Sequence, residues 1–430
     1  MKFYSTNNPQ HKVSLREAVL KGLAPDGGLY FPEQIPTLSG SFIGSLSEQS
    51  NVSIALSVAK NLLGEEVEEK ELQRIVEQTV FFDVPVVEVE NNVYSLELFH
   101  GPTLAFKDFG ARFMASLLGY FSKSEKEEIT VLVATSGDTG SAVAHGFHKV
   151  PGVRVFVLYP SGKVSDLQEK QFTTLGDNIT ALEIDGTFDD CQRLVKTAFQ
   201  DAELKSKLVL TSANSINIAR LIPQSFYYFF TMAQLGQKEP VVFSVPSGNF
   251  GNLTGGILAW RMGLPIHQFV ASTNINDIVP FYLDNGKFNP RPSIQTISNA
   301  MDVGNPSNFA RMLALFQDDY HEMSKMIRGY AFTDDETRDA MKTVDKGSGY
   351  TLDPHGAIGY LGLKKYQTSN PVKGVFLETA HPGKFREVVE ETLGRKVELP
   401  ERLSNLITRQ KKSIEMSSSF EEFREFLLRH

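Results

Sequence analysis

The sequence predicts an α/β protein built on a mostly parallel sheet with helices on both faces. From residue 93 onward, short runs rich in β-branched residues alternate with segments whose apolar residues recur at helical spacing. This alternation is typical of parallel strands, because each crossover between them needs a connection long enough to hold a helix. A chain of 430 residues, 41% of them apolar, is also long enough for a large buried core and for two or three domains.

Three regions follow one another along the chain. Residues 1–92 are predicted to form a mainly helical amino-terminal domain, with helices over 14–21 and 54–63. A core domain is predicted over 93–400, and its expected strands are 93–98, 129–134, 153–158, 179–184, 241–245, 266–271 and 375–377. The tail, 401–430, is predicted to be helical and to dock on the body through the apolar face formed by Phe420, Phe423, Phe426 and Leu427.

Composition excludes several function classes. The net charge is −8 and the isoelectric point is near 5.7, with no dense basic segment, so we expect no binding to nucleic acid, whose phosphates require a basic face. The single cysteine, Cys191, provides neither a disulfide framework nor a zinc spacing, so we predict a reducing compartment, core packing for Cys191 and no metal site. The first residues lack the apolar centre of a signal peptide, and no apolar run is long enough to span a membrane. We therefore expect a cytoplasmic protein with no membrane association.

The segment HGPTLAFKDFG, residues 100–110, is the predicted centre of the chemistry. Its first half is rich in turn residues, whereas the residues after Lys107 show helical spacing, so Lys107 lies where a constrained loop meets a helix. With Leu104, Phe106 and Phe109 nearby, its amine is partly desolvated, and desolvation favours the neutral, nucleophilic form. The alternative is an exposed surface lysine, which is the commoner state of lysine in proteins.

Two glycine-rich loops share one arrangement. The expected strands 129–134 and 241–245 each end in such a loop, SGDTG at 136–140 and SGNFGN at 247–252, and a helical pattern follows each loop. Glycine lets the backbone approach a ligand closely, and the free N–H groups at a helix start attract an anion. Either loop alone is an ordinary connection of an α/β protein, and neither has the Gly-Lys-Ser/Thr ending of a nucleotide P-loop. Two anion sites together with one activated lysine are more informative than either loop.

The lysine segment resembles the one that carries the cofactor-binding lysine in the threonine synthase family, which are pyridoxal-phosphate enzymes of the tryptophan-synthase-like group. Further segments resemble that family and follow its order along almost the whole chain: GLAPDGGLYFP at 22–32, TSGDTG at 135–140, SANSIN at 212–217 followed by Arg220, PSGNFGN at 246–252, SNAMD at 298–302 and TAHP at 379–382. The resemblance implies fold type II, with two twisted, mostly parallel sheets flanked by helices and a smaller mobile subdomain at about 110–235. It also implies pyridoxal 5'-phosphate as the cofactor, with Lys107 as its covalent attachment point and as the catalytic base.

The same resemblance implies the residues that bind the cofactor and the substrate carboxylate. The cofactor phosphate is expected on the second loop, at Gly248, Asn249, Phe250, Gly251 and Asn252. The substrate carboxylate is expected near Ser136, Gly137 and Thr139. Thr379 is expected to meet the pyridine nitrogen, where a hydroxyl, unlike a carboxylate, does not favour a protonated ring. The alternative for Thr379 is a strand-end threonine that bonds the local backbone.

A phosphorylated substrate needs further cations, because burying a dianion against backbone dipoles alone is costly. Lys163 and Arg220 are the candidates, together with Asn214 of the SANSIN segment. The alternative for both cations is an ordinary surface charge.

Asp138 leaves two arrangements open. By resemblance it faces the phenolic oxygen of the cofactor, and because two anions in contact repel, a proton would then be shared between them. Alternatively, Asp138 turns away and caps the following helix, since aspartate is a favoured N-cap residue.

The resemblance implies conversion of O-phospho-L-homoserine and water to L-threonine and phosphate, by γ-elimination followed by β-addition of water, as a monomer or homodimer. Two alternatives remain: a related phospho-lyase or serine/threonine dehydratase of the same fold, and a noncatalytic protein that binds a phosphorylated metabolite. Lys107 distinguishes the last of these, because a binding protein needs no covalent amine.

Overall fold

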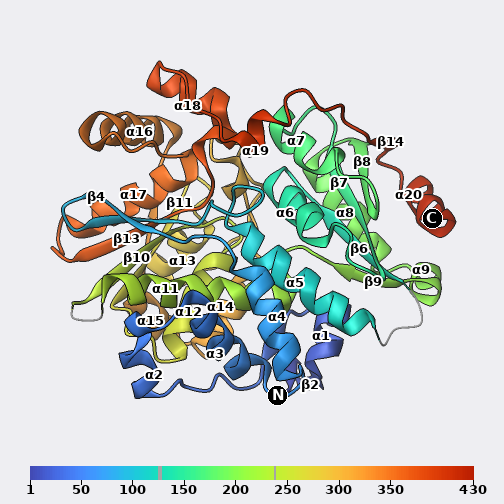
Figure 1. The fold of residues 1–430 in the computed structure, drawn as a ribbon, viewed down its shortest axis with the longest axis horizontal. Helices are drawn as coiled ribbons and strands as arrows, with labels where there is room; N and C mark the ends of the chain where they lie inside the picture. The colour runs from blue at the N-terminus through green and yellow to red at the C-terminus, as the bar shows by residue number, and fades with distance from the viewer. Residues whose placement is uncertain (124–127, 237–238) are drawn as a thin grey trace.

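The computed structural model describes residues 1–123, 128–236 and 239–430. Figure 1 shows two sheets side by side, with the first residues of the chain below them and the C-terminus beside the second sheet. The strands β6 (Ile129–Ala134) and β10 (Val241–Pro246) are buried along their whole length. This burial is expected of parallel strands that helices cover on both faces.

The first sheet has six strands in the order β12-β11-β10-β13-β5-β4. Its neighbouring strands are parallel except β4 and β5, which pair antiparallel. Besides β10, the strands are β4 (Val86–Glu90), β5 (Val93–Glu97), β11 (Gln268–Thr273), β12 (Ile327–Ala331) and β13 (Lys373–Glu378). The late strand β13 thus lies between β5 and β10.

The second sheet has five parallel strands in the order β14-β8-β7-β6-β9. Besides β6, these are β7 (Val153–Pro160), β8 (Ile179–Asp185), β9 (Val209–Ser212) and β14 (Ile414–Ser417). The edge strand β14 comes from the tail of the chain.

Helices surround both sheets (Figure 1). Those of the core are α5 (Lys107–Ser122), α6 (Asp138–Phe147), α7 (Asp166–Thr173), α8 (Phe188–Ala198), α9 (Ala202–Lys207), α10 (Ile218–Leu221), α11 (Phe226–Leu235), α12 (Gly251–Arg261), α13 (Ile278–Asn285), α14 (Phe309–Leu315), α15 (Tyr320–Met326), α16 (Asp334–Ser348), α17 (Pro354–Gln367) and α18 (Arg386–Leu393). Three short 3₁₀ helices, η2 (Ile222–Ser225), η3 (Asn299–Met301) and η4 (Pro382–Phe385), lie among them.

The amino-terminal region is mainly helical, as predicted, but it also contains a small sheet that the sequence did not predict. Its helices are α1 (Leu15–Lys21), α2 (Gly40–Gly44), η1 (Leu46–Glu48), α3 (Asn51–Leu63) and α4 (Glu69–Thr79). The sheet is antiparallel, in the order β2-β1-β3, and consists of β1 (Phe3–Ser5), β2 (Asn8–Val13) and β3 (Tyr30–Pro32). Helices α3 and α4 pack against α11 and α5 of the core.

All seven strands expected in the core are present, with ends shifted by up to two residues. The short strands β4, β9, β12 and β14 were not predicted. The tail forms α19 (Glu401–Ser404) and α20 (Phe420–Arg429), and α20 docks through Phe423 and Leu427 onto the apolar cluster that contains Cys191. Both the docking face and the core packing of Cys191 are confirmed. The pairing of β4 with β5 crosses the boundary expected between residues 92 and 93, and the domain limits stay a prediction.

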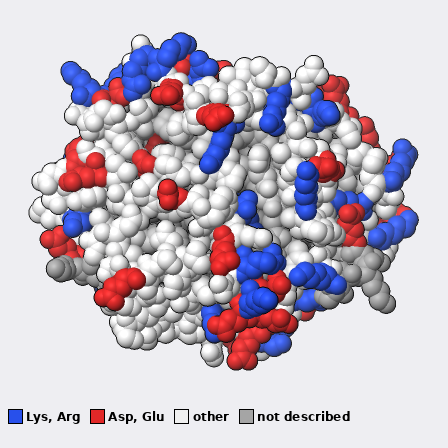
Figure 2. Space-filling model, in the orientation of Figure 1, with Lys and Arg blue, Asp and Glu red and all other residues white. Residues whose placement is uncertain are grey.

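The surface carries both signs of charge. On the face shown in Figure 2, basic and acidic side chains are interspersed, and both kinds gather over the amino-terminal helices. Within residues 1–123, 128–236 and 239–430, no helix is long and apolar enough to cross a membrane.

Candidate active site

Lys107 is the first residue of α5, and the loop before it is tied to the end of β13. Phe106 N donates to the carbonyl oxygen of Thr379 at 2.8 Å, and His381 N donates to that of Leu104 at 3.0 Å. Only 18% of the Lys107 side chain is exposed, so the alternative of an exposed surface lysine is wrong. Burial lowers the pKa of Lys107 from its ordinary value, which favours the neutral amine.

The buried carboxylate of Asp108 holds the loop that precedes Lys107 in place. Asp108 accepts hydrogen bonds from Thr103 N at 2.8 Å and from Thr103 Oγ1 at 2.7 Å. A Cβ atom on Gly101 would lie 2.4 Å from Asp108 Oδ2, so only glycine fits there. The turn residues of the HGPT segment therefore bring the backbone against Asp108, and this packing fixes the start of α5.

The first glycine-rich loop joins β6 to α6. Thr135 Oγ1 accepts hydrogen bonds from Gly137 N at 2.9 Å and from Gly140 N at 2.8 Å, which holds the loop in a tight turn. Gly137 has φ of 141°, a value that disfavours other residues, and it is the N-cap of α6 without any side-chain cap. The proposed helix-cap role of Asp138 is therefore wrong, because Asp138 already lies inside the helix and its side chain bonds elsewhere.

The carboxylate of Asp138 lies between two lysines. Its Oδ1 atom is 2.6 Å from Lys384 Nζ and accepts a hydrogen bond from Gln168 Nε2 at 2.9 Å, while Oδ2 is 4.0 Å from Lys107 Nζ. Burial opposes ionisation of Asp138, but the charges of Lys384 and Lys107 outweigh it and hold the pKa well below its ordinary value. This carboxylate therefore has a counter-charge of its own, and a proton shared with a cofactor oxygen is not needed to balance it.

The second glycine-rich loop presents unpaired backbone donors. Among the residues the structure describes, the amides of Gly248, Asn249 and Phe250 have no hydrogen-bond acceptor, and the first turn of α12 follows directly. Phe250 has φ of 59°, an uncommon value for a residue other than glycine. A Cβ atom on Gly248 would lie 2.6 Å from the Met301 Cα atom, so the loop passes closely under the 298–302 segment. This geometry suits an anion at the start of α12.

The side chain of Asn252, in the first turn of α12, is held in place by two tyrosines of α11. Its Oδ1 atom accepts hydrogen bonds from Tyr227 OH at 2.7 Å and Tyr228 OH at 2.9 Å. Its Nδ2 atom is buried and has no partner within the described part of the chain. Since an unpaired buried donor is costly, the arrangement indicates that a ligand completes it.

Arg220 and Lys163 differ in their surroundings. Arg220 is 4% exposed, donates from Nη1 to the Ala213 carbonyl oxygen, and leaves a buried Nε without a partner among the described residues. Burial lowers its pKa to about 10, with partial compensation from Asp108, so Arg220 stays charged at neutral pH. Lys163 is exposed, in the turn after β7. The surface-charge alternative is thus wrong for Arg220, while Lys163 lies at an open edge.

One cavity of about 1810 Å³ gathers these groups. The predicted site residues that line it are Lys107, Ser136, Asp138, Thr139, Lys163, Asn214, Arg220, Gly248, Asn249, Phe250, Gly251, Asn252 and Thr379. Gly137 is the exception, because it turns toward Gln168, 2.7 Å from where its Cβ atom would lie. Thr379 is 7% exposed and uses its backbone carbonyl for the lysine loop.

Sequence reasoning missed four residues that shape the site. Lys384, Gln168, Thr135 and Gln224 lie on or just behind the cavity wall, and Gln224 presents an unpaired Oε1 atom among the described residues. Thr135 stands in the TSGDTG segment and was within reach of the sequence motifs, whereas Lys384 lies two residues beyond TAHP and outside every motif.

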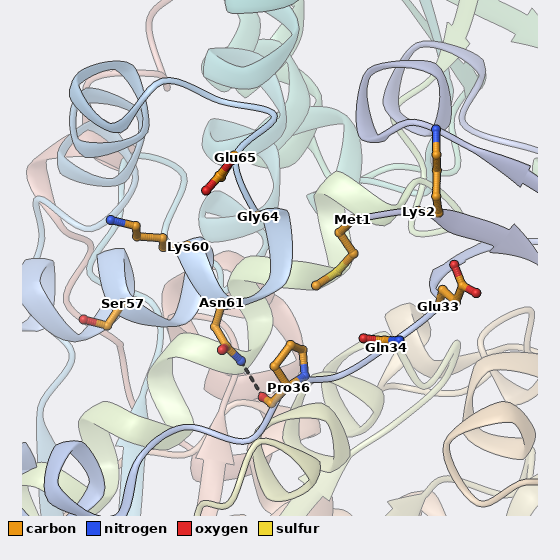
Figure 3. A pocket seen from close by; sticks show the side chains of 10 residues that line it. All are labelled: Met1, Lys2, Glu33, Gln34, Pro36, Ser57, Lys60, Asn61, Gly64 and Glu65. Carbon is orange, nitrogen blue, oxygen red and sulfur yellow. Dashed lines mark hydrogen bonds between the residues drawn. The ribbon is translucent and has the colours of Figure 1, made fainter.

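A second pocket, of about 830 Å³, lies elsewhere (Figure 3). It is lined by Lys2, Glu33, Lys60 and Glu65 among others, and Asn61 spans one side by donating to the Pro36 carbonyl oxygen at 2.5 Å. None of the residues singled out from the sequence takes part in it, so we assign it no chemistry.

Comparison with known proteins agrees with this geometry. The chain is 47% identical over 431 residues to the threonine synthase of Haemophilus influenzae, with 100% of each chain covered. The chain belongs to the threonine synthase family. Family models described as "Threonine synthase N terminus", "Pyridoxal-phosphate dependent enzyme" and "Threonine synthase, C-terminal" match residues 2–80, 73–375 and 356–427.

Solved structures of this family have the same fold. The crystal structure of threonine synthase from Escherichia coli covers 100% of both chains, with a TM-score of 0.93 and 44% identity. The structure of threonine synthase from Brucella melitensis with bound pyridoxal phosphate covers 100% of this chain and 99% of its own, with a TM-score of 0.94 and 36% identity. The fold type II architecture predicted for this chain is thereby confirmed, and pyridoxal phosphate is the cofactor of the family.

The residues of the cavity fit that cofactor. Three consecutive amides and the Asn252 Nδ2 atom, all without a partner among the described residues, suit a phosphate group, and a buried, desolvated lysine suits covalent attachment to an aldehyde.

Proposed function

We propose that this protein converts O-phospho-L-homoserine and water to L-threonine and inorganic phosphate, with pyridoxal phosphate as its cofactor. The observation that carries the proposal is the cavity in which a desolvated lysine, Lys107, meets the amides of loop 248–250, which have no acceptor among the described residues, and a buried arginine, Arg220. The loop suits the cofactor phosphate, the first glycine-rich loop would take the substrate carboxylate, and Arg220 is left for the substrate phosphate.

The loop 248–252 would hold the cofactor phosphate, Lys107 would bind the cofactor covalently, and Thr379 would place its hydroxyl at the pyridine nitrogen. When bound, pyridoxal phosphate supplies an electron sink for charge that develops beside the substrate's α carbon. Asp138 lies on the same wall of the cavity as Lys107, and its Oδ2 atom is 4.0 Å from Lys107 Nζ. This short distance supports the assignment that Oδ2 faces the cofactor.

Lys107 acts as the proton carrier of the reaction. Once the substrate amine has replaced it on the cofactor, the free Lys107 amine would move protons at the α and β carbons in separate transfers, while phosphate departs with the electrons of the γ C–O bond. The proton removed from the β carbon would end on the γ carbon, and the α proton would be restored at the end. Water would add its hydroxyl to the β carbon, and its remaining proton would go to the departed phosphate. Burial lowers the pKa of Lys107 and so favours its neutral amine, which is the form that accepts a proton.

Binding of the substrate is assigned to both walls of the cavity. Ser136 and Thr139 of the first loop, which line the cavity, would hold the carboxylate, and Gly137 would shape the turn between them, since its amide already donates to Thr135 Oγ1. Arg220 would hold the phosphate together with Asn214, and Lys163 would close the open edge. Because Lys163 is exposed, its contact with the substrate would require movement of the mobile subdomain predicted at about 110–235.

We further propose that the protein acts in the cytoplasm as a monomer or homodimer on this small-molecule substrate, without a nucleic-acid partner. Sedimentation of the purified protein decides between the two assemblies. The buried Cys191, whose thiol pKa is raised by burial to about 12, supports a role in packing rather than redox chemistry.

The decisive experiment supplies purified protein with O-phospho-L-homoserine, L-threonine or L-serine in separate reactions. We expect equal amounts of phosphate and threonine from the first substrate and no 2-oxo acid and ammonia from the other two. Phosphate release without threonine would indicate another phospho-lyase, and 2-oxo acid formation would indicate a dehydratase. A noncatalytic binding protein would show neither product and no visible absorbance that borohydride removes.

A further inference from the structure

Lys384 is the most deeply buried lysine near the site, and neither the motifs nor the proposed reaction uses it. Its side chain is 0% exposed, and its Nζ atom lies 2.6 Å from Asp138 Oδ1 and donates to the Thr103 carbonyl oxygen at 2.8 Å. It belongs to η4, which follows β13 of the first sheet after a short link that contains Thr379, whereas Asp138 belongs to α6, which follows β6 of the second sheet. The ion pair therefore joins the two halves of the molecule beside Lys107.

Two lysines compete for the one carboxylate, and their distances are unequal. Asp138 forms a close ion pair with Lys384, while Lys107 Nζ is 4.0 Å from the other oxygen. Gln168 also donates to the oxygen that Lys384 contacts, so the carboxylate is held in that orientation. If Lys384 were absent, the uncompensated carboxylate would attract the Lys107 ammonium instead.

We propose that Lys384 is a positioning residue that holds the Asp138 carboxylate in a close ion pair. Lys107 therefore forms no close ion pair with Asp138 and remains available as a neutral amine. The positive charge of Lys384 acts in the same direction, because a like charge nearby disfavours an ammonium. The importance of Lys384 for turnover rests on the proposed function. Its effect on the protonation of Lys107 does not depend on that function.

The other charged groups around Lys107 do not replace Lys384. Arg220 of α10 also disfavours the ammonium but is directed to the Ala213 carbonyl oxygen. Asp108, on the same helix as Lys107, bonds Thr103. Burial lowers the pKa of His145 in α6 to about 4, so this ring is neutral at physiological pH. Lys384 is thus the cation that directly neutralises Asp138.

The test measures the protonation of Lys107 directly. The full-length chain, freed of cofactor, receives a brief pulse of acetic anhydride at a series of pH values, and acetylation of Lys107 is quantified by peptide mass spectrometry. For Lys384→Met we expect the pH midpoint of Lys107 acetylation to rise by at least about one unit, because a charge within about 4–6 Å shifts a pKa by roughly 1–3 units. The matched control, Lys342→Met, removes an exposed lysine of α16 and should leave the midpoint unchanged.

A second comparison guards against misfolding, since Lys384→Met leaves Asp138 buried without its partner. Asp138→Asn should lower the Lys107 midpoint, and adding Lys384→Met to that variant should raise it again. The double variant has neither buried charge, whereas Asp138→Asn alone keeps the Lys384 charge without its partner. Cofactor loading, followed by visible absorbance at neutral pH, should slow about tenfold or more in Lys384→Met and recover at higher pH. Equal Lys107 midpoints with and without Lys384, in whichever background is folded, would overturn the proposal even if threonine is formed.

Discussion

Replacing Gly248 by alanine tests the assignment of the second glycine-rich loop to the cofactor phosphate. The added Cβ atom would lie 2.6 Å from Met301 Cα and 3.1 Å from the Met301 carbonyl carbon and oxygen, all of them backbone atoms. Gly248 is not among the residues with positive φ, so the cost comes from this contact and not from backbone conformation. The loop or the 298–302 segment must move, and overpacking of this kind costs about 1–3 kcal/mol.

Movement of the loop also displaces the unpaired amides that we assign to the phosphate. Hydrogen bonds to a charged group contribute about 1.5–3 kcal/mol each, so misplacing one of them should weaken cofactor binding roughly 10- to 150-fold. The matched control is Gly347→Ala in α16, where the new Cβ atom meets nothing within 4 Å. That change should stabilise the helix by about 0.5–1 kcal/mol and leave the cofactor affinity unchanged.

The assay combines thermal unfolding without cofactor and a cofactor titration followed by fluorescence quenching. Gly248→Ala should lower both the unfolding midpoint and the cofactor affinity, and Gly347→Ala should lower neither. If Gly248→Ala is folded and binds the cofactor as tightly as the original protein, the phosphate does not lie on this loop.

Three further predictions concern the lysine, the arginine and the tail. Lys107→Ala should abolish release of phosphate from O-phospho-L-homoserine while leaving the unfolding midpoint close to its original value; near-native turnover would remove Lys107 from the mechanism. Arg220→Ala should lower kcat/KM for that substrate at least tenfold, because losing one partner of a buried charge pair costs about 2–5 kcal/mol, whereas cofactor affinity should change little. Loss of cofactor instead would move Arg220 off the substrate phosphate. Glu183 is paired with Lys411 of the tail at 3.0 Å, and although burial opposes its ionisation, hydrogen bonds from Lys411 and neighbouring hydroxyls lower its pKa from 4.5 to about 2. Because the folded-state pKa is depressed, this stabilisation is present above pH 4.5 and is lost as the pH falls to about 2. The protection factors of the β14 amides, which correct for the intrinsic pH dependence of exchange, should therefore fall over that interval, and Glu183→Gln should remove this fall.

The core strands were predictable because their signal is local. The strand β6 has six consecutive buried residues, and its apolar run predicts both of its ends. The edge strand β12 has one buried residue among five, so its sequence lacks the pattern that marks a strand. The strands of the amino-terminal sheet are short, and pairing between distant segments decides them instead of local preference.

Much of the site was accessible from sequence for a similar reason. Asp138 and Asn249 lie in glycine-rich segments that connect a predicted strand to a predicted helix. Lys107 lies where a run of turn residues meets a predicted helix. Lys384 carries no such mark, since a lysine in a Pro-Gly-Lys-Phe turn usually lies at the surface. Its burial depends on Asp138, which lies in the helix that follows β6 of the other sheet, and no local sequence pattern reveals such a contact.

The place of β13 in the first sheet determines when the site can form during synthesis. β5 and β10 lie on either side of β13 and contact it instead of each other, and the loop before Lys107 bonds backbone groups that follow β13. A ribosome that has made only the first 370 or so residues has thus produced both glycine-rich loops but not the strand that aligns them with the lysine. Domains usually fold from the N-terminus as they emerge, but here closure of the sheet waits for almost the last segment of the chain. The unpaired edges of β5 and β10 are exposed until then, so a nascent or truncated chain that ends before β13 should be a substrate for chaperones and prone to aggregation.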